Sequence, residues 1–223
     1  PNVHLRPFKR NTGFAAGHNR NLREIFNNHQ PDYVWLLNND CIALPGCISA
    51  LSKCAAKDPQ VAIWGATLLE DDGNTVQCAG GCFYNSWLSS YHQFGRGQAT
   101  SRIEELHTPV FDYISGASMF FPSETLVDGL SPARTGRNAR PEGGRTYLNE
   151  EFFLYFEELD LAKRLRPASR TGWCREAKIR HAGGLATGAK GGNRTAQAEY
   201  HSTLSALKFT SLYYPGRLWV TIP

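Results

Sequence analysis

Apolar runs of strand length alternate along this chain with stretches of helical periodicity. Segments 33–38 and 61–66 are continuous apolar runs, which is typical of strands buried on both faces in parallel sheets flanked by helices. Apolar residues recur at helical spacing in segments 22–26 and 48–54, which predicts one helix before each of these strands. This alternation predicts an α/β fold.

Further elements are expected at both ends of the chain and in its middle. Segment 1–5 is predicted to be a strand, and the apolar segments 110–116 and 117–121 are predicted to be strands that pair with each other. A C-terminal helix that carries Tyr200, Leu204 and Leu207 is expected. Residues 132–146 combine arginine with glycine, proline and asparagine, which predicts a mobile insertion loop.

Aromatic residues without a clear period occupy residues 85–108, including Trp87, Tyr91 and Phe94. This stretch is expected to be a long loop or a short hairpin. Exposed aromatic rings in loops can stack on sugars, whereas buried rings belong to the core. The sequence leaves both interpretations open for these three side chains.

The first chemically distinctive segment is Asn38-Asn39-Asp40, at the end of the apolar run 33–38. In open α/β sheets, ligands bind in the crevice at the carboxyl ends of the strands. A carboxylate at such a strand end suits a hard divalent cation that carries a phosphorylated ligand. The alternative is that these residues only form a polar turn.

The second such segment is an aromatic run that ends in acids from Glu157 to Asp160. Acids in the first turn of a helix complement its dipole, which explains part of the pattern. Helical spacing places Glu158 on the inward face and lets Asp160 pair with Arg164 four residues later. Desolvation would raise the pKa of an inward carboxyl group, so Glu158 is the candidate general base, while Glu157 and Asp160 are expected to position it or to form ion pairs.

The third segment is an alternating run over 177–181 that ends at His181, before a glycine-rich stretch. The alternation predicts a strand whose last inward residue is His181. A single histidine is usually a hydrogen-bonded polar residue, but beside a metal-binding carboxylate it becomes a candidate ligand.

Composition narrows the class of protein. The chain has 223 residues and a formal net charge of +4, which does not indicate nucleic acid as a partner and tolerates anionic ligands. No apolar run is long enough to span a bilayer, and a cytoplasmic protein is expected. The six cysteines lack zinc-finger spacing and are expected to be reduced and structural.

Four segments, taken in order, resemble glycosyltransferase family 2. They are Asn11-x-Gly13-Phe14-Ala15-Ala16-Gly17-x-Asn19, Leu36-Leu37-Asn38-Asn39-Asp40, the segment from Phe152 to Arg164, and His181-x-Gly183-Gly184. Each is short, but their order over residues 11–184 is specific. Within the family they most resemble the rhamnosyltransferase-like branch of bacterial polysaccharide assembly.

The resemblance implies a GT-A fold, which is a Rossmann-like mixed sheet with helices on both faces. It also implies a nucleotide-sugar donor, a divalent metal (Mg²⁺ or Mn²⁺) and inversion at the anomeric carbon. Asp40 matches the metal-binding carboxylate of a DXD-like motif, and His181 matches a histidine that holds metal and diphosphate. Glu158 stands where most members have the aspartate base, and it follows the matching acid Glu157; Asp160 belongs to the same catalytic segment. The residues that the resemblance assigns to donor binding are Asn11, Gly13, Phe14, Gly17, Asn19, Asn38, Asn39 and Arg164.

The family's first strands, which contact the nucleotide, would precede Pro1. The chain is therefore expected to be a single GT-A domain over 1–223 that lacks its N-terminal βαβ portion and has weak or no activity by itself. The expected acceptor is a hydroxyl of a glycan or lipid-linked oligosaccharide, with rhamnose as the expected sugar; peripheral association with the inner face of a membrane stays open. Two alternatives remain: a non-catalytic carbohydrate-binding or scaffold domain derived from a transferase, and a nucleotidyltransferase.

Overall fold

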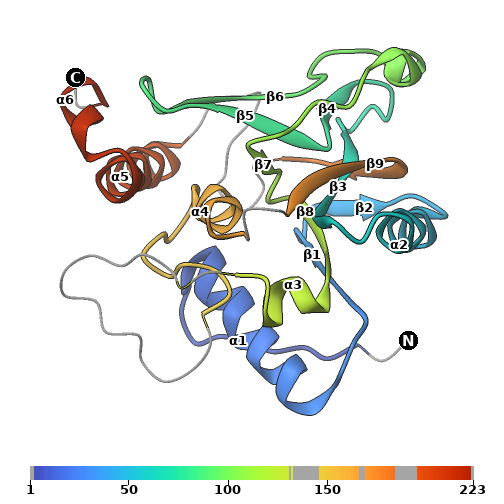
Figure 1. Ribbon diagram of the computed structural model, residues 1–223, viewed down its shortest axis with the longest axis horizontal. Helices are drawn as coiled ribbons and strands as arrows, with labels where there is room; N and C mark the ends of the chain where they lie inside the picture. Colours follow the sequence, from blue (N-terminus) through green and yellow to red (C-terminus); the bar gives the residue numbers. More distant parts are fainter. Residues whose placement is uncertain (1–2, 131, 133–145, 166–168, 184–194, 222–223) are drawn as a thin grey trace.

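The computed structural model describes residues 3–130, 132, 146–165, 169–183 and 195–221 (Figure 1). The predicted loop 132–146 lies almost wholly outside these residues. In chain order the elements are α1 (Gly13–Asn28), β1 (Tyr33–Leu37), β2 (Cys41–Ala43), α2 (Cys47–Lys57), β3 (Val61–Leu69), β4 (Val76–Ala79), β5 (Gly81–Asn85), β6 (Ser90–Gln93), η1 (Thr100–Glu105), β7 (Tyr113–Ile114), β8 (Ser118–Pro122), α3 (Ser123–Val127), α4 (Glu157–Arg164), β9 (Arg170–His181), α5 (Ala196–Tyr213), η3 (Pro215–Arg217) and α6 (Leu218–Thr221).

A mixed sheet of six strands forms the centre of the structure. Its order is β1-β8-β3-β9-β2, and β4 pairs with β3. β3 runs parallel to β9, whereas the other pairs are antiparallel. All nine residues of β3 are buried, because neighbours on both edges and helices on both faces remove this strand from water.

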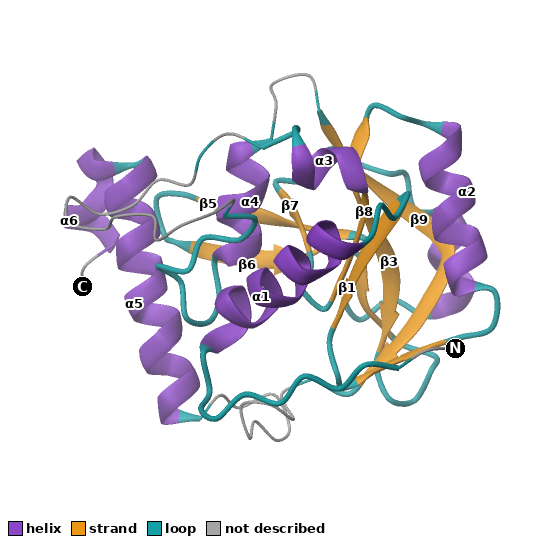
Figure 2. Cartoon of the chain, turned by 90° about the horizontal axis from the view of Figure 1, so that it is seen from below, coloured by secondary structure: helices purple, strands orange, loops and turns teal. Residues whose placement is uncertain are grey.

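Helices cover both faces of the sheet (Figure 2). On one face, Ala15 and Leu22 of α1 pack into a core cluster with Val34 and Leu36 of β1. On the other face, Leu51 of α2 belongs to a second cluster that includes residues of β3 and β9. The two clusters arise because successive strand residues point to opposite faces. The predicted mixed sheet with helices on both faces is confirmed.

A smaller sheet of three strands, in the order β6-β5-β7, lies beside the α4 and α5 helices (Figure 1). The expected short hairpin is β5–β6, and it pairs Tyr84 with Tyr91. Phe94 packs against the core, whereas Trp87 is 52% exposed. The aromatic residues of this stretch therefore divide between core and surface.

Several predicted elements are wrong because pairing partners are set by tertiary contacts. Residues 3–5 are not a strand, and β1 is an edge strand of the described sheet that pairs antiparallel with β8, so it is not a strand of a parallel sheet buried on both faces. Segments 110–116 and 117–121 contain β7 and β8, but β7 pairs with β5 and β8 pairs with β1 and β3.

The predicted C-terminal helix is confirmed as α5, but two of the three apolar residues named for it are exposed. Tyr200 is 63% exposed and Leu204 is 36% exposed, whereas Ala198, Ser205 and Phe209 of α5 are buried. Ser205 contributes to this packing because its hydroxyl donates a hydrogen bond to the Leu154 carbonyl oxygen, at 2.9 Å. α5 thus packs on the aromatic run before α4 through small residues and one phenylalanine.

Candidate active site

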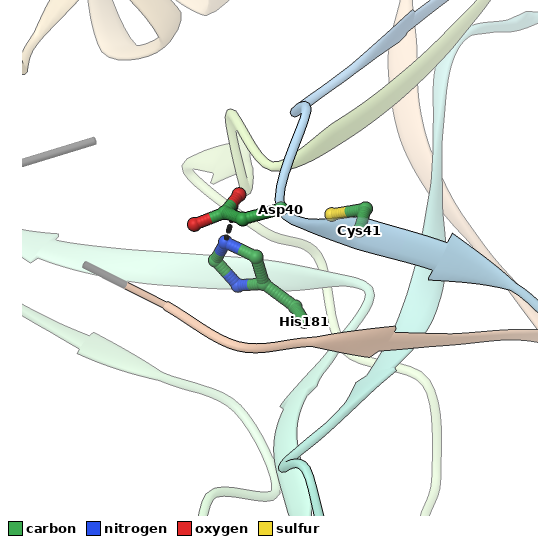
Figure 3. A group of neighbouring side chains, drawn as sticks. All are labelled: Asp40, Cys41 and His181. Atoms are coloured by element: carbon green, nitrogen blue, oxygen red, sulfur yellow. Dashed lines mark ion pairs between the residues drawn. The ribbon is translucent and has the colours of Figure 1, made fainter. Parts of the chain in front are cut away.

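Asp40 and His181 meet at one edge of the central sheet. After β1 the chain turns, and the Cys41 N–H donates to the Asn38 carbonyl oxygen at 3.2 Å. β2 then pairs with the end of β9 so that Cys41 lies opposite His181. This register places Nε2 of His181 3.2 Å from Oδ1 of Asp40, with both side chains largely buried (Figure 3).

Gln77 of β4 fixes the orientation of the His181 ring. Its Nε2 donates to Oε2 of Glu70 at 3.2 Å and to the His181 carbonyl oxygen at 3.3 Å. Its Oε1 lies 2.6 Å from Nδ1 of His181. Because that oxygen can only accept, Nδ1 must donate, and in the neutral ring Nε2 then carries a lone pair that faces Asp40. Gln77 carries no sequence signal for this role, and only the pairing of β4 with β3 brings it here.

This arrangement fits a divalent cation. Oδ1 of Asp40 is buried and has no hydrogen-bond partner within the described part of the chain. It faces the lone pair of His181, and two acceptors at 3.2 Å repel each other unless a cation or a proton lies with them. A carboxylate at a strand end suits Mg²⁺ or Mn²⁺. The metal-binding roles of Asp40 and His181 stay predictions.

Cys41 lies close to the same pair but offers a poor ligand. Its Sγ, a carboxylate oxygen of Asp40 and a ring nitrogen of His181 fall within 4.8 Å of one another. Burial, and then the charge of Asp40, raises the pKa of the Cys41 thiol to about 12. The thiol also donates to the Ala117 carbonyl oxygen, at 3.6 Å. A metal is bound by the thiolate and not by the thiol, so Asp40 and His181 are the stronger pair.

Two acids begin α4 at the wall of a cleft. Tyr155 and Phe156 adopt the left-handed region, with φ of 68° and 71°, which is costly for residues with a side chain and is concentrated at functional sites. This backbone turns Glu158 toward Gly116, where an added Cβ would lie 3.4 Å from Oε1 of Glu158. A side chain at position 116 would therefore crowd the carboxylate.

Burial perturbs both acids. It raises the pKa of Glu158 to about 7. Burial, and then the charge of Glu158, raises the pKa of Glu157 well above its usual value. Oε2 of each has no hydrogen-bond partner within the described residues. Glu158 can therefore exchange a proton near neutral pH, and burial beside Glu158 favours the protonated form of Glu157.

One cleft of about 240 Å³ connects the acids with the strand-end segment. Phe14, Asn38, Glu157, Glu158 and His181 all contribute to its lining. Tyr84, Tyr91 and Tyr113 add three phenol rings to the wall. Residues from six parts of the chain are thus brought to one cavity.

Asp160 and Arg164 lie outside this lining and form a buried network. Asp160 Oδ2 accepts from Nε of Arg164 at 2.7 Å, and Oδ1 accepts from the Tyr213 hydroxyl at 2.8 Å and from Nδ2 of Asn149 at 3.1 Å. The Arg164 guanidinium also donates to the Tyr147 carbonyl oxygen. The predicted ion pair is confirmed, and its contacts fasten α4 to segment 146–149 and to α5.

The N-terminal motif fastens α1 to the segment before α4. The Asn11 side chain accepts from the Gly13 N–H at 2.9 Å, and the Phe14 N–H donates to the Phe153 carbonyl oxygen at 3.0 Å. Gly13 has φ of +82°, and a Cβ there would lie 2.5 Å from that carbonyl oxygen, so only glycine fits. Asn19 is fully buried and exchanges hydrogen bonds with the Leu148 backbone.

Among the eight residues assigned to donor binding, Phe14 and Asn38 line the cleft. Asn39 is exposed, and Gly17 has open space as far as the Thr12 hydroxyl at 4.0 Å. Arg164 is 2% exposed. Six of the eight residues therefore do not line the cleft. The donor-binding roles of all eight stay predictions.

The central sheet and its helices define a GT-A-like mixed α/β architecture. The chain matches no protein-family model. It is similar to the N-acetylglucosaminyl-diphospho-decaprenol L-rhamnosyltransferase of two strains of Mycobacterium tuberculosis, with 26% identity over 196 residues. The alignments cover 78% of this chain and 55% of each relative, so the chain spans about half the length of these curated relatives. The similarity supports a glycosyltransferase-like protein.

Within the described residues, no helix is long and apolar enough to cross a membrane.

Proposed function

We propose that this protein transfers a sugar from a nucleoside-diphosphate donor to a hydroxyl group of a glycan or lipid-linked acceptor, with inversion at the anomeric carbon. Rhamnose is the proposed sugar and a lipid-linked diphospho-sugar the proposed acceptor, because the two similar mycobacterial proteins are named for both.

One observation carries the proposal: Glu158 and His181 line the same cleft, and His181 contacts Asp40 behind it. An inverting transfer needs a base on the acceptor side and a group that stabilises negative charge on the leaving diphosphate. The cleft offers a carboxylate with a pKa of about 7 for the first task. It offers the Asp40–His181 pair for the second.

Glu158 would act as the base. Its carboxylate accepts the proton of the acceptor hydroxyl while the acceptor oxygen attacks the anomeric carbon. The bond from that carbon to the diphosphate oxygen breaks in the same displacement, and the nucleoside diphosphate leaves. Because the attacking oxygen enters opposite the leaving group, the anomeric configuration inverts.

Asp40 and His181 would hold a divalent ion. When bound, such an ion neutralises charge on the leaving diphosphate. Gln77 keeps Nε2 of His181 directed at Asp40 through the hydrogen bond to Nδ1, so the ligand pair is oriented before the donor arrives. Asn38, whose N–H donates to the Ala117 carbonyl oxygen at 3.0 Å, presents its side chain to the cleft beside this pair.

A donor screen with the purified protein tests the proposal. The reaction contains Mn²⁺, a lipid-linked diphospho-N-acetylglucosamine and one nucleotide sugar at a time, and it is followed by nucleoside diphosphate release and product mass. We expect release of the nucleoside diphosphate together with an acceptor that is heavier by one sugar residue. Pyrophosphate release, or binding of sugars without turnover of any donor, would contradict the proposal.

A further inference from the structure

Two cysteines that are far apart in the sequence meet where α2 packs on β9. Sγ of Cys54 lies 2.6 Å from Sγ of Cys174. Cys174 is fully buried, whereas Cys54 is partly exposed. Neither residue lines the cleft or contacts the Asp40–His181 pair, so this sulfur pair is separate from the candidate active site.

The separation of these two sulfurs is too short for thiols that merely touch. The neighbouring pair Cys78 and Cys82 shows an ordinary thiol contact in the same molecule, with the sulfurs 4.0 Å apart. Two thiolates bound to one zinc ion, each at about 2.3 Å in a tetrahedral arrangement, would lie about 3.8 Å apart. The 2.6 Å separation of Cys54 and Cys174 lies between these contact distances and the bond length of a disulfide, about 2.0 Å, so both free thiols stand within reach of bond formation.

We propose that Cys54 and Cys174 are a site of thiol oxidation and form a disulfide that ties α2 to β9. With glutathione disulfide as the oxidant, the Cys54 thiolate attacks one sulfur of the reagent, whose S–S bond breaks, and one glutathione leaves as a thiolate. The Cys174 thiol then attacks Sγ of Cys54, the mixed disulfide bond breaks, and the second glutathione leaves as a thiol that takes up the Cys174 proton. Two protein thiols are oxidised while one glutathione disulfide is reduced to two glutathione molecules.

The surroundings assign different roles to the two cysteines. Cys54 is the partner that a solvent oxidant can reach. The adjacent Cys174 thiol lowers the pKa of Cys54 by stabilising its thiolate, which favours Cys54 as the attacking group. Cys174, held in the core beside it, can then displace the bound reagent.

A bridge at this point would fasten an irregular part of β9. Cys174 lies opposite Ala66 of β3, but the next partner in β3, Thr67, lies opposite Lys178. The Thr67 hydroxyl donates to the Arg175 carbonyl oxygen at 3.0 Å inside this bulge. The bulge sets the register of the strand end that carries His181. A cross-link between residues 120 positions apart also restricts the unfolded chain, so the oxidised protein should be more stable.

Peptide mapping tests this proposal. The protein is incubated with glutathione disulfide, denatured, alkylated and digested under non-reducing conditions. We expect a cross-linked peptide that joins Cys54 to Cys174 and the loss of two alkylated sites. A phosphine reductant should reverse both and should lower the Tm by several degrees.

Variants make the result decisive. Cys54→Ser lies at the partly exposed position and should fold, lose the cross-link and show no dependence of Tm on reductant; Cys78→Ser should keep the cross-link. The proposal fails if both cysteines are fully alkylated after oxidation. It also fails if glutathione stays attached to Cys54, or if both thiols are protected only until a chelator removes zinc.

Discussion

The Nε2 atom of His181 lies 3.2 Å from Oδ1 of Asp40. Asp40 lies in the turn after β1, whereas His181 ends β9, so the two residues are far apart in the sequence. Neither element could place its side chain alone. The pairing of β2 with β9 sets this distance, and Gln77 sets which ring nitrogen faces the carboxylate. A ring nitrogen and a carboxylate oxygen are thereby held together in a largely buried position.

Asp40→Asn should remove most of the affinity for Mn²⁺ while the fold is retained. The amide keeps the size of the side chain but supplies no charge for the ion. The measurement is Mn²⁺ binding by calorimetry or electron paramagnetic resonance, with circular dichroism as the fold control. Asp112→Asn is the matched variant away from this pair and should bind as wild type. Unchanged affinity in Asp40→Asn would mean that the segment is only a turn.

Gln77→Ala should weaken Mn²⁺ binding by about 10- to 100-fold, the usual effect of losing a partner that orients a ligating histidine. The ring of His181 would lose the acceptor at Nδ1 and could turn away from Asp40. Gln60→Ala, at an exposed glutamine, serves as the control and should leave affinity unchanged. Equal affinities for the two variants would show that Gln77 has no part in orienting His181.

Glu158→Gln should lower kcat of sugar transfer by about 10²- to 10⁴-fold, the typical contribution of a positioned base. Glutamine has nearly the same shape but cannot accept the proton of the acceptor hydroxyl. Donor binding, measured by calorimetry, should change little. Glu105→Gln, at a side chain that is 63% exposed, should retain full activity. Retention of transfer by Glu158→Gln would remove Glu158 from the role of base.

The transfer rate should rise with pH through about pH 7. Glu158 must be ionised to act as a base, and its pKa is raised to about 7 by burial. A rate that is flat from pH 5 to pH 9 would contradict this role. The profile should be recorded as kcat/KM, because that ratio reports the pKa values of the free enzyme.

The same residue should make wild-type stability fall as pH rises from about 4.5 to about 7. In that window the folded protein keeps the Glu158 proton, whereas the unfolded chain, with a pKa near 4.5, has lost it. Fewer protons in the unfolded state mean that unfolding becomes easier with rising pH. Glu158→Gln should therefore be more stable than wild type at pH 8, by at most about 3 kcal/mol, and nearly equal to it at pH 4.5. Thermal melts at both pH values check this.

Arg164→Ala should destabilise the fold by about 3–5 kcal/mol, because Asp160 would stay buried without its cation. Asp160 is fully buried and accepts from Arg164 at 2.7 Å. The exposed pair of Arg102 and Glu105 offers the matched comparison, and Arg102→Ala should cost less than about 1 kcal/mol. Urea melts measure both. Similar small losses in the two variants would show that the buried network is not needed for stability.

Much of the fold and part of the candidate site could be predicted from the sequence. Continuous apolar runs located β1 and β3, and helical spacing located α1, α2 and α4. The i,i+4 spacing of Asp160 and Arg164 predicted their ion pair. These features depend on local periodicity, which a sequence carries directly.

Strand partners could not be predicted in this way. β7 and β8 are neighbours in the chain but pair with different strands, because β7 belongs to the three-stranded sheet and β8 to the central sheet. The role of Gln77 also depends on strand pairing, because β4 reaches His181 only through its contact with β3. A single glutamine in a strand has no sequence pattern that predicts such a role. The exposure of Tyr200 shows that an apolar spacing does not by itself select the packed face of a helix.

Residue type and local pattern identify three candidates for chemistry: the Asp40 carboxylate at a strand end, the Glu158 acid at the start of a helix and His181 at the end of a strand. The packing of the chain brings Glu158 and His181 to one cleft and turns His181 toward Asp40. Residue type and period are local properties, whereas distance and desolvation depend on packing between segments far apart in the chain. That packing raises the pKa of Glu158 toward neutrality.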